Sequence, residues 1–171
     1  MSERNVLREN FSLDYGDCVS YRGKQYPVEA TDSSRGGFDG ERFYMPPDLS
    51  PEQLKNICVQ IYRRLAKQHL TERTLAFARQ TSVAPAAIKI TGARMRWGSC
   101  SAKKSINYSW RLIMAADEII DYVVVHELAH LVQMNHSKKF WVVVEKILPD
   151  YRSRQAGLKD LQQRLGGENW G

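Results

Sequence analysis

One stretch decides the fold of this chain: residues 119–130, which read IIDYVVVHELAH. Its run of apolar residues predicts a largely buried helix that begins at a cap near Asp117. Residues four apart share one face of a helix, so His126 and His130 can direct their ring nitrogens at one metal ion. Glu127 lies beside these ligands, where it can take a proton from a metal-bound water. A buried carboxylate without a partner is costly, and a metal with its water supplies that partner.

A catalytic zinc site needs a third protein ligand and one position left open for water. The preferred candidate is His136, because Asn135 can adopt a left-handed conformation and turn the chain back toward the ion. The spacing resembles that of metzincins, although Gln133 stands where they have glycine, and no methionine follows to make a Met-turn. The alternative third ligand is Glu145, as in thermolysin-like enzymes. Three imidazoles favour Zn²⁺, although another divalent metal could occupy such a site.

Composition sets the class of protein. The chain has 171 residues, of which 43% are hydrophobic and 26% charged, as expected for one globular domain. No apolar run approaches the roughly 20 residues that span a membrane, and residues 1–10 lack the apolar core of a secretory signal. The net charge of +6 favours anionic partners, but the sequence contains no specific nucleic-acid motif. Nothing in it indicates an oligomeric state.

Cysteine usage indicates the compartment. Cys18, Cys58 and Cys100 are far apart, odd in number and form no CxxC pair. A disulfide framework is therefore not expected, and we predict a reducing, cytoplasmic location. A zinc finger is not expected either, because its paired thiolates are missing.

The N-terminal part, residues 1–48, is predicted to be rich in β-structure. Alternating apolar residues at 19–21 and 26–28 predict a hairpin, and residues 43–45 predict a third strand. Ser50 and Gln53 then form a capping box at the start of a helix.

The rest of the chain alternates between helix and strand signals. Thr71 is expected to cap a second helix, which would leave His69 exposed at the end of the first. Period-two patterns at residues 88–90 and 106–110 predict two strands, joined by a loop around residues 98–104. Helices are expected after Ser137 and from about residue 151. The pattern is α+β: a single domain over residues 1–171, with a small mixed sheet packed against helices and a metal-site core at residues 85–150.

Five segments resemble a known family. They are RWGSCS at 96–101, INYSWRLI at 106–113, IDYVVVHELAHL at 120–131, NHS at 135–137 and FW at 140–141. Together they resemble the YgjP-like metallopeptidase family, zincin-like bacterial proteins related in site plan to the SprT-like group. The resemblance is strong over about residues 85–150 and looser over the N-terminal hairpins.

The resemblance implies a zincin-like fold. It implies metal ligands at His126, His130 and His136, with Glu127 as general base. It also implies that the sheet beside the metal includes the strand ending near Arg96. In zincins, an edge strand of this sheet often holds an extended peptide by strand addition.

The substrate is less well determined than the chemistry. Some members of the resembled family are associated with nucleotide pyrophosphatase activity, notably on UTP. Arg94, Arg96, Lys103 and Lys104 lie around the loop before the site helix and are the candidate substrate-binding residues. Arginines beside a metal suit a polyphosphate, whereas the ordinary interpretation is solvated surface charge.

We therefore expect a zinc-dependent hydrolase of the metallopeptidase type, acting on peptides. One alternative is a metal-dependent UTP pyrophosphatase with a nucleotide substrate. A second is a non-catalytic basic binding module with a structural zinc, for which Cys100 is the candidate fourth ligand.

Overall fold

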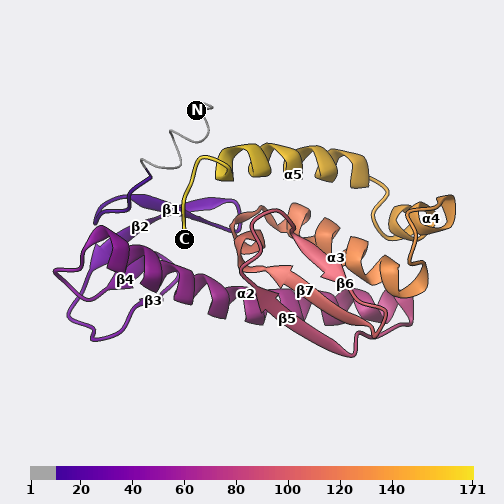
Figure 1. The fold of residues 1–171 in the computed structure, drawn as a ribbon, viewed down its shortest axis with the longest axis horizontal. Helices are drawn as coiled ribbons and strands as arrows, with labels where there is room; N and C mark the ends of the chain where they lie inside the picture. The colour runs from indigo at the N-terminus through magenta and orange to yellow at the C-terminus, as the bar shows by residue number, and fades with distance from the viewer. Residues whose placement is uncertain (1–10) are drawn as a thin grey trace.

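The computed structural model describes residues 11–171 and contains two small β-sheets connected by a long helix (Figure 1). The elements, in chain order, are β1 (Cys18–Tyr21), β2 (Lys24–Ala30), β3 (Gly37–Phe38), β4 (Phe43–Met45), α2 (Pro51–Thr81), β5 (Ala87–Thr91), β6 (Gly98–Cys100), β7 (Ser105–Ser109), the 3-10 helix η1 (Trp110–Met114), α3 (Asp117–Val132), α4 (Lys138–Ile147) and α5 (Tyr151–Leu165). The segment 1–10, on which the expectation about a secretory signal rests, lies outside the described residues.

The first sheet has the strand order β1-β2-β4-β3. The predicted hairpin is confirmed: β1 and β2 are antiparallel and are joined by Arg22 and Gly23, both with positive φ, at 49° and 81°. Two consecutive left-handed residues make the type I′ turn that suits the twist of a two-residue hairpin. The third predicted strand is β4, which runs parallel to β2. The short strand β3, which the sequence did not predict, pairs with β4.

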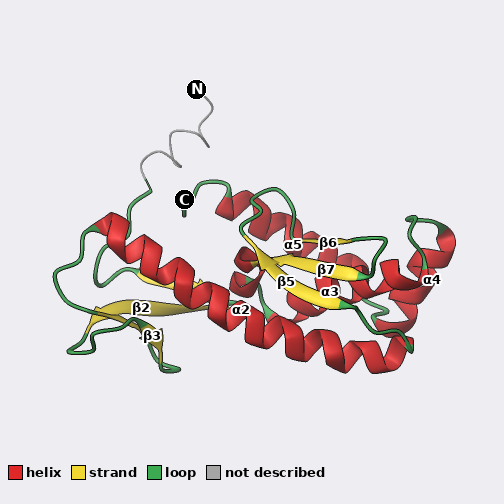
Figure 2. Cartoon of the chain, turned by 60° about the horizontal axis from the view of Figure 1, so that its bottom comes forward, coloured by secondary structure: helices red, strands yellow, loops and turns green. Residues whose placement is uncertain are grey.

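Helix α2 runs beside both sheets (Figure 2). Its predicted capping box is present, with Gln53 N donating to Ser50 Oγ at 3.2 Å and Ser50 N donating to Gln53 Oε1 at 2.9 Å. The predicted helix start at Thr71 is wrong, because α2 continues through this residue for 31 residues in all, a length of about 46 Å. Its buried face continues past Thr71 to Thr74 and Phe77, so core packing overrides the local capping signal.

The second sheet has the order β5-β7-β6. β5 and β7 are the two predicted strands and pair in parallel. The expected loop around residues 98–104 in fact contains β6, an edge strand antiparallel to β7. Trp110, expected at the end of a strand, begins η1 instead and stacks on Tyr62 of α2 at 5.3 Å between ring centroids. This stacking ties the second sheet to the long helix.

The remaining helices cover the core beside α2. Asp117 is the first residue of α3 and not its cap: the N-cap is Ala116, with no side-chain cap bond, and Asp117 accepts hydrogen bonds from Arg22 instead. α3 packs against α2, α4, α5 and β6. After α5 the chain returns to the first sheet, where Trp170 lies 5.1 Å from Phe11 between ring centroids. The architecture is the predicted α+β arrangement of small mixed sheets packed on helices. No helix of the described part has both the length and the apolar content to cross a membrane.

Candidate metal centre

Three imidazoles meet at the C-terminal end of α3. One ring nitrogen each from His126, His130 and His136 can be chosen so that all three lie within 4.8 Å of one another. This is the only such group of three or more metal-ligating side chains in the described part of the chain. The sequence predicted all three residues, and the structure brings them together.

The ring of His130 is held in one orientation. Its Nδ1 lies 3.1 Å from the carbonyl oxygen of Met134. A carbonyl can only accept, so Nδ1 carries the proton, and the neutral ring presents its Nε2 lone pair. A hydrogen bond of this kind is the usual outer support of a metal-binding histidine.

His136 reaches the cluster by a different route from the predicted one. Asn135 is not among the residues with positive φ; instead α3 ends at Val132 and Gln133 is extended, with φ −136° and ψ 110°. The pKa of His136 is lowered from its ordinary value, first by burial and then by the neighbouring imidazoles. The geometry therefore favours a neutral imidazole, which is the form that binds metal.

An apolar floor supports the cluster. Phe140 of α4 is fully buried, and its ring centroid lies 5.1, 4.6 and 4.9 Å from those of the three imidazoles in chain order. Trp141 stacks on His136 at 6.1 Å and on Tyr151 at 5.2 Å. The start of α4 thus limits how far the rings can move and keeps water from one side of them.

Glu127 is the most unusual side chain of the site. Its side chain is 5% exposed, and Oε1 lies 3.3 Å from His126 Nδ1. Its Oε2 is buried and has no hydrogen-bond partner within the described residues. Leaving a buried carboxylate oxygen unpaired is costly, so this atom indicates a missing partner.

Strand β6 lies directly against this carboxylate. A Cβ added at Gly98 would meet Glu127 Cγ at 3.0 Å and Oε1 at 3.1 Å, closer than nearly all ordinary contacts. Glycine is therefore needed at this position for the strand to approach the glutamate. Because β6 is the edge strand of its sheet, the free strand edge and the glutamate are neighbours.

The residues present fit a divalent cation. Three nitrogen donors suit zinc and several other transition metals, and they leave coordination positions unfilled. The carboxylate of Glu127 lies beside His126, with Oε1 3.3 Å from Nδ1 and Oε2 unpaired, as a group that acts on a water there would. Donor chemistry and the buried unpaired atom therefore agree.

Two other candidate ligands do not join the group. Glu145, the alternative third ligand, is exposed on α4. Cys100, the candidate fourth ligand, is half-buried on β6, and burial, followed by the charge of Glu127, raises the pKa of its thiol. A raised pKa disfavours the thiolate that metal binding or nucleophilic attack needs. His69 is not at an exposed helix end: it lies inside α2 with 11% of its side chain exposed.

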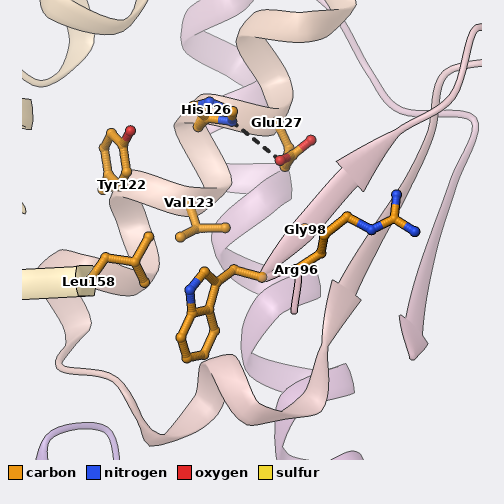
Figure 3. A pocket seen from close by; sticks show the side chains of 8 residues that line it. Arg96, Gly98, Tyr122, Val123, His126, Glu127 and Leu158 are labelled. Carbon is orange, nitrogen blue, oxygen red and sulfur yellow. Dashed lines mark hydrogen bonds and ion pairs between the residues drawn. The ribbon is translucent and has the colours of Figure 1, made fainter. Parts of the chain in front are cut away.

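A cavity of about 160 Å³ opens next to the imidazoles (Figure 3). It is lined by Arg96, Trp97, Gly98, Tyr122, Val123, His126, Glu127 and Leu158. Of the four basic residues expected at the substrate, only Arg96 lines this cavity. Arg94, Lys103 and Lys104 are exposed and are not part of its lining.

Sequence reasoning missed most of the cavity lining. Trp97 and Tyr122 stood in the recognised segments, but nothing in their spacing assigned them to a site. Leu158 comes from α5, beyond the expected core of residues 85–150, and only packing of that helix brings it here. Gly98 was expected in a loop, so the close approach that a glycine within a strand often marks could not be inferred for it.

Comparison with known proteins identifies the family of the chain. A family model described as YgjP-like, metallopeptidase domain, matches residues 2–161. The metallopeptidase zymogen of Pyrococcus abyssi abylysin has a similar crystal structure, with 23% identity over 58% of this chain and 97% of that chain, at a TM-score of 0.50. The metallopeptidase zymogen of Methanocaldococcus jannaschii jannalysin has 19% identity over 55% and 95% of the two chains, at a TM-score of 0.47. The abylysin likeness shows a shared fold. No curated protein matches the chain.

Proposed function

The chain belongs to the YgjP-like family of metallopeptidase domains, and we propose that it is a zinc peptidase in which Glu127 is the general base. Membership makes the protein a metal-dependent hydrolase. We propose further that the metal is zinc, that His126, His130 and His136 are its ligands, and that the substrate is a polypeptide. It also treats the described residues as one domain, which is supported by the contacts of α2 with both sheets.

One observation carries the proposal: the buried, unpaired Oε2 of Glu127 beside three clustered imidazoles. A structural carboxylate at this depth would be expected to have hydrogen-bond donors around it. A general base needs a free lone pair within reach of the proton that it abstracts. The arrangement supports the second role.

The imidazoles would hold the metal through one ring nitrogen each, with the His130 ring fixed by its bond to Met134. A divalent metal held there supplies Lewis acidity, which polarises a carbonyl and makes water more acidic. Glu127 accepts the proton of the attacking water at Oε2 and returns it to the departing amine nitrogen. Its burial, at 5% exposure, keeps bulk water from competing for that proton.

The cavity favours peptide over nucleotide. Arg96 is the one basic side chain in its lining, and the remaining wall is largely apolar. A polyphosphate calls for several cations around it, whereas Arg94, Lys103 and Lys104 do not line this space. The structural-zinc alternative calls for a fourth protein ligand, and the described group has three. As part of the proposal we keep the reducing, cytoplasmic location, which three unpaired cysteines support.

The test compares zinc-loaded wild type with Glu127→Gln on unfolded β-casein and on UTP. We expect wild type to cut casein and the variant to lose roughly 10²–10⁴-fold in rate, the usual contribution of a positioned general base. Zinc content by mass spectrometry and circular dichroism should be unchanged, because glutamine keeps the shape of the side chain.

Glu145→Gln is the matched control, since it makes the same chemical change at an exposed carboxylate on α4. It should cut casein at the wild-type rate. A Glu127→Gln variant as active as wild type would remove Glu127 from the mechanism. Wild type that carries one zinc and leaves casein intact, but releases pyrophosphate from UTP, would replace the peptidase with the nucleotide alternative.

A further inference from the structure

The cavity beside Glu127 has one apolar side. Tyr122 and Val123 of α3 are each 4% exposed and form its wall together with the half-buried Leu158. Figure 3 shows Leu158, Val123 and Tyr122 around the same space, with Glu127 on the adjoining turn of α3. Arg96 extends its guanidinium on the other side of Gly98, away from Leu158. The apolar wall is therefore next to the reacting groups, and the guanidinium of Arg96 is at the rim.

Close packing of α5 on α3 places that wall. A Cβ added at Gly157 would meet Ile119 Cδ1 at 2.8 Å, so glycine lets the two helices approach at this point. Glycine inside a helix is destabilising relative to alanine. Its presence here is explained by the close approach, which brings the next residue, Leu158, to the cavity.

The size and chemistry of the cavity define what fits. Its volume of about 160 Å³ is similar to that of a known apolar cavity, about 150 Å³, that binds benzene. A charged group entering here would lose its water against a wall of hydrocarbon, which is unfavourable.

We infer that this cavity is a specificity pocket that takes one leucine- to phenylalanine-sized apolar side chain, from the residue next to the scissile bond. The inference rests on the proposed function for the position of that bond. The inference narrows the substrate class to polypeptides that have an apolar residue next to the cleaved bond. Folded proteins bury such residues, whereas unfolded segments expose them.

Binding of small zinc-directed probes tests the pocket without requiring turnover. We would measure, by calorimetry on zinc-loaded protein, two hydroxamates that differ only in the adjacent side chain, isobutyl or carboxymethyl. Wild type should bind the isobutyl compound tighter by about tenfold or more, as expected for burying one leucine-sized group. Equal affinity for the two compounds overturns the inference, even if casein is cut.

One substitution at the wall and one control elsewhere on α5 sharpen the test. Leu158→Lys adds a cation beside the cavity and should abolish or invert the preference for the isobutyl compound. Leu165→Lys is the matched control, with the same change at a half-buried leucine two turns further along α5, and should retain the preference. If both lysine variants lose it equally, the wall is not the cause and the inference fails.

A second variant covers the case in which lysine disrupts folding. Leu158→Ala keeps the wall apolar and enlarges it, so a hydroxamate with a naphthylmethyl side chain should gain affinity relative to the isobutyl compound. An unchanged ratio of the two affinities would contradict the pocket.

Failure of the pocket and failure of the proposed peptidase function can be told apart. A preference for the isobutyl compound without casein cleavage rejects the peptidase and keeps the pocket. Glu127-dependent cleavage whose mapped cut sites show no apolar bias rejects the pocket and keeps the peptidase.

Discussion

The two halves of α3 treat their carboxylates in opposite ways. In the first half, Asp117 accepts two hydrogen bonds from Arg22 at 2.6 and 2.9 Å. One turn on, Asp121 accepts two from Arg73 at 2.8 and 2.9 Å. In the second half, Glu127 is more buried than either aspartate, yet its closest polar contact is an imidazole at 3.3 Å. The same helix pairs these two aspartates with arginines and leaves its buried glutamate without such a partner.

This difference separates structure from function. The first half shows that the fold can supply arginines where a carboxylate needs them. The second half therefore keeps an unpaired carboxylate oxygen that lowers the stability of the fold. The neighbouring imidazoles support the proposed role of that carboxylate as a general base. Charge is a poor guide to the active centre here, because most of the basic residues expected at the substrate do not reach the cavity. Unpaired burial is informative only together with the imidazoles, since His69 Nε2 and Thr71 Oγ1 of α2 are also buried without a hydrogen-bond partner among the described residues but lie outside the cluster.

The largest effect should come from removing a ligand in the second half. His130→Ala leaves two imidazoles, and we expect bound zinc to fall from about one ion per chain to well below one, because three protein ligands are the usual minimum. Metal analysis after dialysis measures this. His69→Ala is the control, since His69 lies on another helix outside the cluster. Stoichiometric zinc in His130→Ala would refute the proposed ligand set.

The next effect should come from moving Glu127 without changing it. Gly98→Ala places a methyl group 3.0 Å from Glu127 Cγ, so the carboxylate must shift. We expect casein cleavage to fall by up to roughly tenfold with zinc retained, since the carboxylate must move by a few tenths of an ångström, and a displacement of about 1 Å can cost 10²-fold. Ser99→Ala, at the next position of β6, should cleave normally. Full activity in Gly98→Ala would show that the position of Glu127 is not set by this strand.

Part of the candidate site was predictable from the sequence. The spacing of His126 and His130 on one helix fixes their common face locally, so two ligands and the glutamate followed from periodicity. His136 depended on the path of the chain after the helix: the structure brings its ring to the other two imidazoles, but without the predicted left-handed conformation at Asn135.

The rest depends on packing between distant segments. β6 has only three residues, Gly98–Cys100, and its strand character comes from pairing with β7, which no local pattern encodes. Thr71 carries a genuine capping signal, but α2 passes through it because the buried face is continuous. Leu158 reaches the cavity only because α5 folds back over α3.

A smaller effect is expected in the first half of α3. Asp121→Asn weakens the bond to Arg73, whose side chain is 36% exposed, so the loss in unfolding free energy should be roughly 0.5–1 kcal/mol. Glu127→Gln should cause no loss in the metal-free protein, because it neutralises an unpaired carboxylate. Urea denaturation of both variants measures the contrast. A larger loss at Glu127 than at Asp121 would reverse the comparison.

The smallest effect is a pH dependence. The hydrogen bond from Arg22 lowers the pKa of Asp117 from its ordinary value of 3.8. The folded state therefore favours the ionised carboxylate, and its contribution is complete above about pH 3.8 and is lost as pH falls through the lower, folded pKa. The unfolding free energy of wild type should decline more steeply than that of Asp117→Asn in this acid range. Parallel curves would show that the pair contributes nothing measurable.

Helix α2 has a consequence for how the molecule opens. It contacts β4 near one end and β5 near the other, and its middle is buried at Tyr62, Ala66 and Leu70. Fraying either sheet leaves these turns covered by η1 and α3, so their amide protons exchange with solvent only when the whole core comes apart. Exchange rates along this one helix thus report the global free energy of unfolding, and faster exchange at one end would identify which sheet detaches first.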